Sequence, residues 1–331
     1  MKRVLFYLNY AARNLWRSKR WTMFALFSIA AGVATIVALR GLGLSITASL
    51  TDNVRQSLKG DVVLTTSTGG GGGGFSFRGT VDRGFSPSTV ETIESYARER
   101  GWQAQAFHRV GGSQVTRVDG QRVGRPQFVT MIYIDPQQYP LTQDITALQP
   151  SGAALKDLFQ GGNEIVISEN LAQSEGIAVG DTVRVSGTEE TFIVRGIVPT
   201  YLEAGLTDLF ASFFGFAYIN QALLETTLAE SASFPNYIAI ALPEGATPDA
   251  IESAENDLRF IPALNSLNFY TDSVPDQLRI NQTIADIISR FVVVMGLGAM
   301  LIGGIGIINT MLVMVRRRTN EIAAMKTFGL K

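Results

Sequence analysis

The sequence contains no cysteine and only one histidine, His108, among its 331 residues. The absence of cysteine excludes disulfides, thiolate nucleophiles and thiolate metal sites, and a single histidine excludes metal sites that need several. Charged residues are also scarce, at 17%, and the 28 basic and 29 acidic ones nearly cancel, so no nucleic-acid surface is expected. In contrast, 46% of the residues are hydrophobic, which is high for a soluble enzyme. The composition therefore predicts a chain shared between water and a membrane.

Two long stretches carry no charged residue, residues 21–39 and residues 291–315. Each is long enough to cross the hydrocarbon core of a bilayer, which needs about 20 residues. A cleaved secretory signal is the alternative for the first stretch, but its apolar part is longer than usual and no clear cleavage site follows it. We therefore predict two transmembrane helices.

Basic residues flank both stretches on the side of the chain ends. Six Lys and Arg residues and no acid precede residue 21, and Arg316, Arg317 and Arg318 directly follow the second stretch. By the positive-inside rule both ends lie in the cytoplasm. Residues 40–290, with 17 basic and 28 acidic residues, are then extracytoplasmic, and the protein is expected in the inner or plasma membrane.

Small residues recur at helical spacing on one face of each predicted span. Such faces let helix backbones approach closely, so we expect them to pack against other membrane helices, although glycine is common in membrane helices in any case. Before the first span, residues 1–20 combine an apolar stripe with basic residues, which predicts an amphipathic helix on the inner membrane surface. The predicted packing residues are Ala25, Ser28, Gly32 and Thr35 in the first span and Ala299, Gly303, Gly306 and Thr310 in the second.

The block of residues 40–290 is predicted to be a mixed α/β domain of two lobes, carried on helical stalks at 41–59 and 276–290. Alternating apolar residues predict strands, and Ser86, Thr247 and Ser168 are predicted to cap helices. The predicted strands are 61–66, 114–118, 127–134, 164–167, 182–185, 191–198 and 237–242, and the predicted helices are 87–100, 169–174 and 248–258.

No catalytic, cofactor-binding or metal site is predicted, and the chain is not expected to be an enzyme. His108 lacks a neighbouring nucleophile motif and is interpreted as a structural or surface histidine. Six consecutive glycines at 69–74 are not followed by the Lys of a phosphate-binding loop and favour an exposed loop. Four phenylalanines within 209–216 favour core packing or a buried strand over contact with lipid or an apolar ligand.

Two runs near the end of the chain carry a specific resemblance. The run IGGIGIINTMLV at 302–313 and the basic run RRTNEIAAMKTFG at 317–329 resemble the FtsX/MacB-like ABC transporter permeases. Weaker similarity lies in the middle of the chain, in DVVL at 61–64 and GDTV at 180–183. Members of that family continue into further membrane helices, so more of them are expected beyond residue 331. The sequence is then expected to be a fragment, an incomplete gene product or the first part of a larger permease with duplicated units.

The resemblance implies a permease subunit that passes the ATP-driven motion of a separate ATP-binding subunit to the extracytoplasmic domain, for export or extraction of an unidentified substrate. It also implies a second permease, identical or paralogous, as a partner. The chain has no ATP-binding motif, so ATP would be used by the partner subunit and no cofactor is expected on this chain.

Residues 316–331 match the cytoplasmic coupling helix of that family, and a membrane-surface anchor is the alternative for this segment. A membrane-anchored sensor or a regulator of cell-envelope partners is the alternative for the whole protein. The residues expected to contact the ATP-binding subunit are Arg317, Arg318, Thr319, Glu321, Ile322, Met325 and Phe328.

Overall fold

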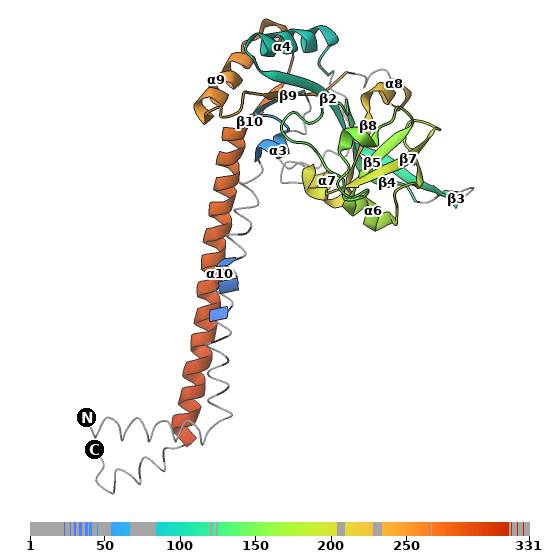
Figure 1. Ribbon diagram of the computed structural model, residues 1–331. Coiled ribbons are helices and arrows are strands. Elements are labelled where there is room, and N and C mark those ends of the chain that lie inside the picture. Colours follow the sequence, from blue (N-terminus) through green and yellow to red (C-terminus); the bar gives the residue numbers. More distant parts are fainter. Residues whose placement is uncertain are drawn as a thin grey trace. The chain divides into compact units, whose positions relative to one another are not determined.

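The computed structural model describes residues 54–66, 84–119, 122–123, 125–203, 209–227, 234–265 and 267–317, with isolated positions at 23–45 and 319–327. The chain forms two compact units, one of residues 53–279 and one of residues 1–52 together with 280–331 (Figure 1). The first of these is the α/β domain.

A single path of paired strands runs through the domain, in the order β10-β1-β9-β2-β4-β8-β5-β7-β6. β3 pairs with β2, and β6 also pairs with β2, which closes the second half of the path into a barrel. The strands are β1 Val62–Thr65, β2 Gln103–Asp119, β3 Arg122–Val123, β4 Gln127–Ile134, β5 Glu164–Ser168, β6 Thr182–Val185, β7 Thr191–Val198, β8 Phe216–Asn220, β9 Tyr237–Ala241 and β10 Tyr270–Ser273.

Short helices connect these strands, and one long helix leaves the domain. The helices are α3 Val54–Leu58, α4 Pro87–Glu99, α5 Leu155–Leu158, α6 Glu169–Glu175, η1 Thr200–Leu202, α7 Leu209–Phe214, η2 Gln221–Leu223, α8 Leu224–Thr227, α9 Pro248–Arg259, η4 Pro262–Leu264 and α10 Val274–Arg317.

The long strand β2 belongs to two lobes. Its first residues, Gln103 to Phe107, pair with β9, and these strands with β1, β10, α4 and α9 form what we call the sheet lobe. Its remainder pairs with β4 and β6 in what we call the barrel lobe. A register shift between Val110 and Ser113, where Gly112 has a φ of +77°, bends β2 so that it can pair on both sides. The mixed α/β class is therefore confirmed, whereas the barrel was not predicted.

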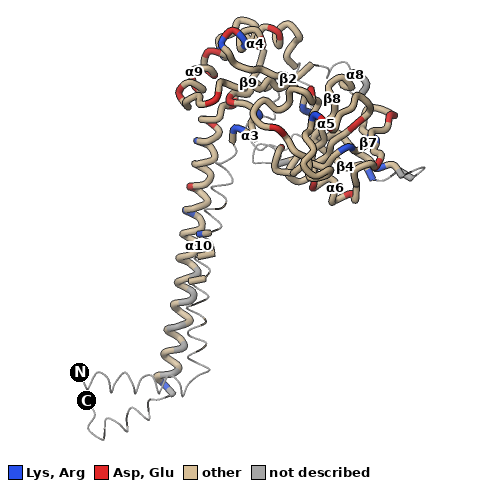
Figure 2. The backbone as a smooth tube through the Cα atoms, in the orientation of Figure 1, with Lys and Arg blue, Asp and Glu red and all other residues tan. Residues whose placement is uncertain are grey.

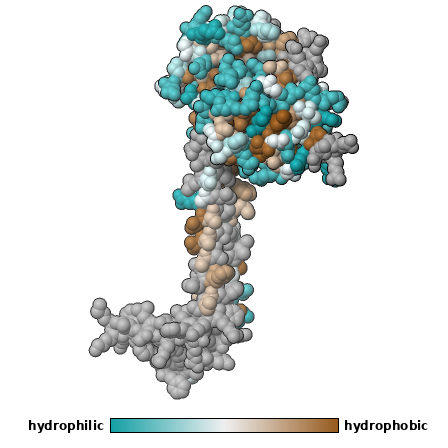
Figure 3. Space-filling view, turned by 45° about the vertical axis from the view of Figure 1, so that its right-hand side comes forward, coloured by the Kyte–Doolittle hydropathy of each residue, from teal (hydrophilic) through white to brown (hydrophobic). Residues whose placement is uncertain are grey.

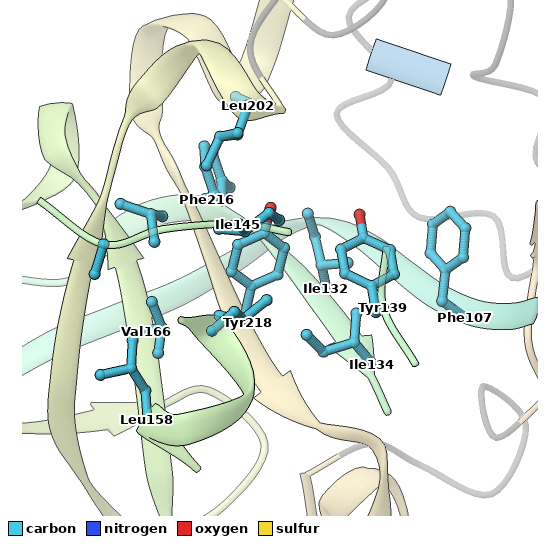
Figure 4. Packing of buried hydrophobic residues seen from close by; sticks show 14 of the residues in the cluster. Phe107, Ile132, Ile134, Tyr139, Ile145, Leu158, Val166, Leu202, Phe216 and Tyr218 are labelled. Atoms are coloured by element: carbon cyan, nitrogen blue, oxygen red, sulfur yellow. The ribbon is translucent and has the colours of Figure 1, made fainter. Parts of the chain in front are cut away.

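Three apolar cores hold the domain together. One lies between the sheet lobe and its helices and includes Ile93 and Leu258, and a second fills the barrel. Alternation along β4 sends Met131 and Tyr133 into the barrel, while Ile132 and Ile134 point outward. Those outward residues belong to the third core, which joins strands of both lobes (Figure 4). We call this third cluster the interlobe core.

Most predicted element boundaries agree with the structure. β4, β6 and β7 coincide with the predicted ranges, and α4 and α9 begin at the predicted caps, where Thr89 N–H donates to Ser86 Oγ (3.2 Å) and Ala250 N–H donates to Thr247 Oγ1 (3.3 Å). Ser168 behaves differently. It precedes α6, but its hydroxyl accepts a hydrogen bond from Phe216 N–H at 2.9 Å and so serves β8.

The phenylalanine run was interpreted wrongly in part. Residues 209–214 form the helix α7 and not a strand, and the helix ends at Gly215, whose φ is +91°. Phe216 is fully buried at the start of β8, as core packing predicts, but Phe213 is 71% exposed. The helix contains three of the four phenylalanines, Phe210, Phe213 and Phe214, and none of these is fully buried, so this part of the run faces solvent.

The helix α10 contains both the predicted second stalk and the predicted second span. By length and composition, the described residues include one helical segment able to cross a membrane, Val274–Gly298, followed by a shorter apolar one, Gly304–Val313. Between Arg290 and Arg316 this helix carries no charged residue, and apolar side chains are exposed along it (Figures 2 and 3), with Phe291 63% and Ile305 66% exposed. An exposed apolar surface of this kind is typical of contact with lipid.

Several predictions fall largely outside the described residues. These are the amphipathic helix 1–20, the first span 21–39 and the six glycines at 69–74. Within the first span a few isolated positions are described, and those, including Met23, Phe27 and Val33, are helical and exposed.

Candidate functional site

Two helices enter the sheet lobe at the same end. α3 is followed by β1 after three residues, and α10 begins directly after β10. β1 and β10 are antiparallel neighbours, with Val62 opposite Ser273, so the start of one strand lies beside the end of the other. We call the three residues between α3 and β1, namely Lys59, Gly60 and Asp61, the root junction.

Asp61 ties three elements of the sheet lobe together. Its side chain is 3% exposed and forms an ion pair with Arg55 of α3, with Nε 2.8 Å from Oδ1. Oδ2 accepts a hydrogen bond from the backbone N–H of Leu242 at 2.8 Å, just after β9. The carbonyl oxygen of Asp61 accepts from Val274 N–H at 2.9 Å, at the first residue of α10. One carboxylate residue thus fixes α3, β9 and α10 to one another.

Gly60 allows the backbone to approach β9 closely. A Cβ at this position would lie 2.7 Å from the carbonyl oxygen of Ile240, which is backbone and cannot move aside easily. The same carbonyl accepts the N–H of Asp61 at 2.8 Å. A side chain at residue 60 would therefore push the root junction away from the sheet.

Lys59 has an unusual backbone and a buried side chain. Its φ is +62°, while the nine other described residues with positive φ are all glycine. The left-handed conformation costs a residue with a Cβ about 1 kcal/mol. The side chain is 3% exposed, and its ammonium donates to the carbonyl of Leu202 at 2.5 Å and lies 3.1 Å from Glu203 Oε1.

Glu203 is the centre of a buried polar cluster between the lobes. Its side chain is 1% exposed and contacts two cations, Lys59 and Arg109, each at 3.1 Å. The hydroxyls of Tyr139 and Tyr218 donate to Oε1 at 2.8 and 2.5 Å. Both tyrosine rings lie in the interlobe core, with their hydroxyl oxygens pointing the same way (Figure 4). We call these five residues the Glu203 cluster.

The electrostatics of the cluster favour an ionised Glu203. Burial by itself raises the pKa of this carboxyl, but the charges of Lys59 and Arg109 and the two tyrosine hydroxyls outweigh it and hold the pKa below its ordinary value. Burial and the carboxylate raise the pKa of Tyr139 and Tyr218 well above the usual range, so both stay protonated donors. Burial lowers the pKa of Lys59, and Glu203 opposes this shift.

Side chains near residue 236 mark where β2 passes from one lobe to the other. The amide of Asn236 accepts from Arg109 N–H and donates to Arg109 O, both at 2.8 Å, in the manner of a strand neighbour. His108 Nδ1 lies 2.6 Å from the carbonyl oxygen of Phe234. Burial lowers the pKa of His108, and because a carbonyl only accepts, Nδ1 carries the proton. The interpretation of His108 as structural is consistent with this position.

The site residues predicted from sequence lie away from this cluster. Arg317 ends α10, and Thr319 is helical, with its hydroxyl donating to Val315 O and Arg316 O at 3.1 and 2.9 Å. Ala299, Gly303, Gly306 and Thr310 lie on α10. The others lie outside the described residues, and their roles stay predictions: Ala25, Ser28, Gly32, Thr35, Arg318, Glu321, Ile322, Met325 and Phe328.

Sequence reasoning did not find the Glu203 cluster. Its members come from five separate parts of the chain, so no local spacing links them. A partial signal was present at Lys59-Gly60, which follows a predicted helix where a left-handed residue is common. Among the described residues no group of three or more His, Asp or Glu side chains is arranged to hold a metal ion.

Comparison with known protein families identifies the α/β domain that contains the root junction. The sequence profile of the MacB-like periplasmic core domain matches residues 22–257. The chain belongs to this family. The resemblance to FtsX/MacB-like permeases is thereby confirmed, and the MacB-like domain of this chain is periplasmic. Comparison with curated protein sequences gives no match.

Two solved structures are similar to the chain. The crystal structure of the periplasmic region of MacB from Actinobacillus actinomycetemcomitans is 16% identical, with a TM-score of 0.44, over 71% of this chain and 97% of that one. A domain of a protein from Porphyromonas gingivalis named as a permease is 16% identical, with a TM-score of 0.37, over 64% of this chain and 88% of that one.

The root of the MacB-like domain is a structural joint. Asp61 fixes the two entering helices to the sheet, and Lys59 connects the same three-residue segment to a buried carboxylate between the lobes. The root junction therefore joins α3 and α10 to the sheet lobe and, through Lys59, to the barrel lobe.

Proposed function

We propose that the chain is a permease subunit of an ABC transporter, which passes the ATP-driven motion of a separate ATP-binding subunit to its periplasmic domain. The substrate is exported or extracted from the membrane. The two membrane spans and a paired second permease, identical or paralogous, are parts of this proposal.

The observation that carries the proposal is the direct passage from β10 to α10. Ser273 is the last residue of the strand and Val274 the first of the helix, so no linker separates them. α10 has 44 residues and, at about 1.5 Å per residue, is about 66 Å long. A flexible linker would absorb a displacement, whereas a helix that continues from a strand carries it into the sheet.

The cytoplasmic end supplies the second part of the proposal. Residues 316–331 would dock in a groove of the ATP-binding subunit, with Ile322, Met325 and Phe328 as the apolar face. Arg318 and Glu321 would orient the helix. ATP would be bound and hydrolysed by the partner, and this chain would bind no cofactor.

Purification of the tagged chain from its native membrane tests this function. We expect an ATPase with a phosphate-binding loop to co-purify with the wild-type chain. Ile322→Asp and Glu321→Lys should abolish this association while membrane insertion stays normal. Thr327→Asp is the matched control, because residue 327 faces away from residues 322 and 325 on a helix and should tolerate the same acid.

Either of two results would contradict the proposal. The first is co-purification of the ATPase at the wild-type level with both variants, which would leave residues 316–331 as a membrane-surface anchor. The second is the absence of any ATPase from the wild-type complex, which would favour a sensor or regulator of envelope partners.

A further inference from the structure

Lys59 is the residue of the root junction whose side chain reaches the other lobe. Its backbone lies between α3 and β1, at the edge of the sheet lobe. Its ammonium contacts the carbonyl of Leu202 and the carboxylate of Glu203, which follow the barrel strand β7. The segment that joins α3 to the sheet is thereby also attached to the barrel lobe.

The backbone of residue 59 does not explain why a lysine stands there. Glycine adopts a positive φ without strain, and every other described position with positive φ in this chain is glycine. A residue held in the left-handed region is a reason to look for a role of its side chain. At Lys59 the side chain is buried and makes two polar contacts with the barrel lobe, which is such a role.

The group that receives the lysine is firmly held. Besides Lys59, Glu203 contacts Arg109 of β2 and the hydroxyls of Tyr139 and Tyr218. Both tyrosines are packed in the interlobe core, so the carboxylate cannot follow a displaced ammonium without disturbing that core. By comparison, Arg55 pairs with Asp61 within the sheet lobe and is 41% exposed.

We propose that Lys59 is a positioning residue that clamps the α3 end of the first stalk to the barrel lobe. α3 and the barrel then move as one body, and a displacement of the first stalk reaches the barrel as well as the sheet. This inference rests on the proposed function, since it names the residue through which part of the motion passes.

Distance measurement between two spin labels tests the clamp directly. The chain has no cysteine, so the pair Ser57→Cys on α3 and Gln173→Cys on α6 can be labelled specifically, and both positions are exposed. In the full-length chain with wild-type Lys59 we expect a narrow distance distribution. Lys59→Met should broaden or shift it, because α3 is released from Glu203.

Arg195→Met is the matched control for this variant. Arg195 pairs with the buried carboxylate of Glu164 at 2.9 Å, but both residues lie within the barrel lobe, on β7 and β5. Its substitution also takes a cation away from a buried carboxylate, yet the distance distribution between positions 57 and 173 should not change. A wild-type distribution in Lys59→Met, or equal broadening in Arg195→Met, would overturn the clamp.

Two further variants keep the test decisive where Lys59→Met folds poorly. Lys59→Gly removes the ammonium and also relieves the strained backbone. The double variant Lys59→Met/Glu203→Gln removes the carboxylate along with the lysine, so no buried carboxylate is left with one of its two cations missing. Both should fold and still show the broadened distribution. A narrow, wild-type distribution in these folded variants would overturn the clamp equally.

A second measurement separates the clamp from the function on which it rests. In the complex with the ATP-binding subunit, added ATP should leave the distance unchanged in wild type and change it in Lys59→Gly, with ATP hydrolysis retained. Broadening in Lys59→Gly without any effect of ATP would keep the clamp and refute motion passing through it. If the distance distribution of Lys59→Gly is not broadened either with or without ATP, the clamp is refuted and the proposed function is left standing.

Discussion

The carboxylate of Glu203 is buried and ionised at once, a combination that depends on all of its partners. Two cations and two hydroxyl donors surround it, each within 3.1 Å. A buried ion pair adds little net stability compared with apolar residues of the same shape, but removal of one partner leaves an uncompensated charge. A single substitution in the Glu203 cluster should therefore lower the free energy of unfolding by more than the whole cluster contributes to it.

Neutralising the carboxylate should destabilise the domain strongly. We expect Glu203→Gln to lower the free energy of unfolding by about 3–5 kcal/mol, because it leaves the Lys59 ammonium buried without a counter-charge. Urea unfolding of the full-length chain measures the change. Glu189→Gln removes an exposed partner of Arg184, at 3.7 Å, and should change the free energy by less than about 0.5 kcal/mol. A similar, small effect of both variants would contradict the prediction.

The lowered pKa of Glu203 predicts how this stabilisation depends on pH. Because the folded state binds the proton less well than the unfolded chain, Glu203 stabilises the fold above the unfolded carboxyl pKa of about 4.3, and the effect is lost as the pH falls through the lower folded value. The difference in unfolding free energy between wild type and Glu203→Gln should be constant between about pH 6 and 8 and shrink below about pH 4. A difference that grows towards acid would show the opposite shift.

At the scale of helices and strands, the sequence predicted what local patterns determine. Alternation located β4, β6 and β7, and side-chain caps located α4 and α9, because both depend on residues close in sequence. Closure of the barrel depends on the pairing of β2 with β6, about 65 residues apart, and on a bend at Gly112, which no local pattern reports. The Glu203 cluster escaped prediction for the same reason.

The glycine of the root junction offers a test at this scale. Gly60→Ala places a Cβ 2.7 Å from a backbone oxygen of β9, so β1 must shift where it pairs with the sheet. We expect a loss of about 1–3 kcal/mol in the free energy of unfolding, as for other overpacked sites.

Gly162→Ala is the matched control for Gly60→Ala. The nearest atom to a Cβ at residue 162 is Glu164 Cγ at 3.9 Å, an ordinary contact. This variant should be neutral or slightly stabilising, by less than about 1 kcal/mol, because alanine restricts the unfolded chain. Denaturant unfolding of the two variants side by side checks the prediction, and equal stability would show that the sheet yields at residue 60.

At the scale of the whole molecule, charge and hydropathy predicted the class of protein and the placement of its domain, whereas they predicted nothing about the Glu203 cluster. Basic flanks and the two uncharged stretches predicted a membrane protein with a large external domain, and membership of a periplasmic domain family agrees with that placement of the domain. These signals are sums over many residues, so they can be read from the sequence without knowledge of which residues are in contact in the fold. The described contacts that join the root junction to the barrel lobe are long-range in sequence, from Lys59 to Leu202 and Glu203, and only the folded structure reveals them.

The orientation of the chain in the membrane gives the last prediction. Ser151 lies exposed in the periplasmic domain, and Thr319 lies exposed beyond α10, just after the basic residues that should stay in the cytoplasm. Since the chain has no cysteine of its own, Ser151→Cys and Thr319→Cys each introduce a single thiol.

In cells whose inner membrane is intact, a membrane-impermeant maleimide should label residue 151. Residue 319 should react only after that membrane is permeabilised, and this requirement also controls for lysed cells. The reverse pattern would invert the topology, and labelling of both residues in intact cells would place both sides of α10 outside, which would refute α10 as a membrane span.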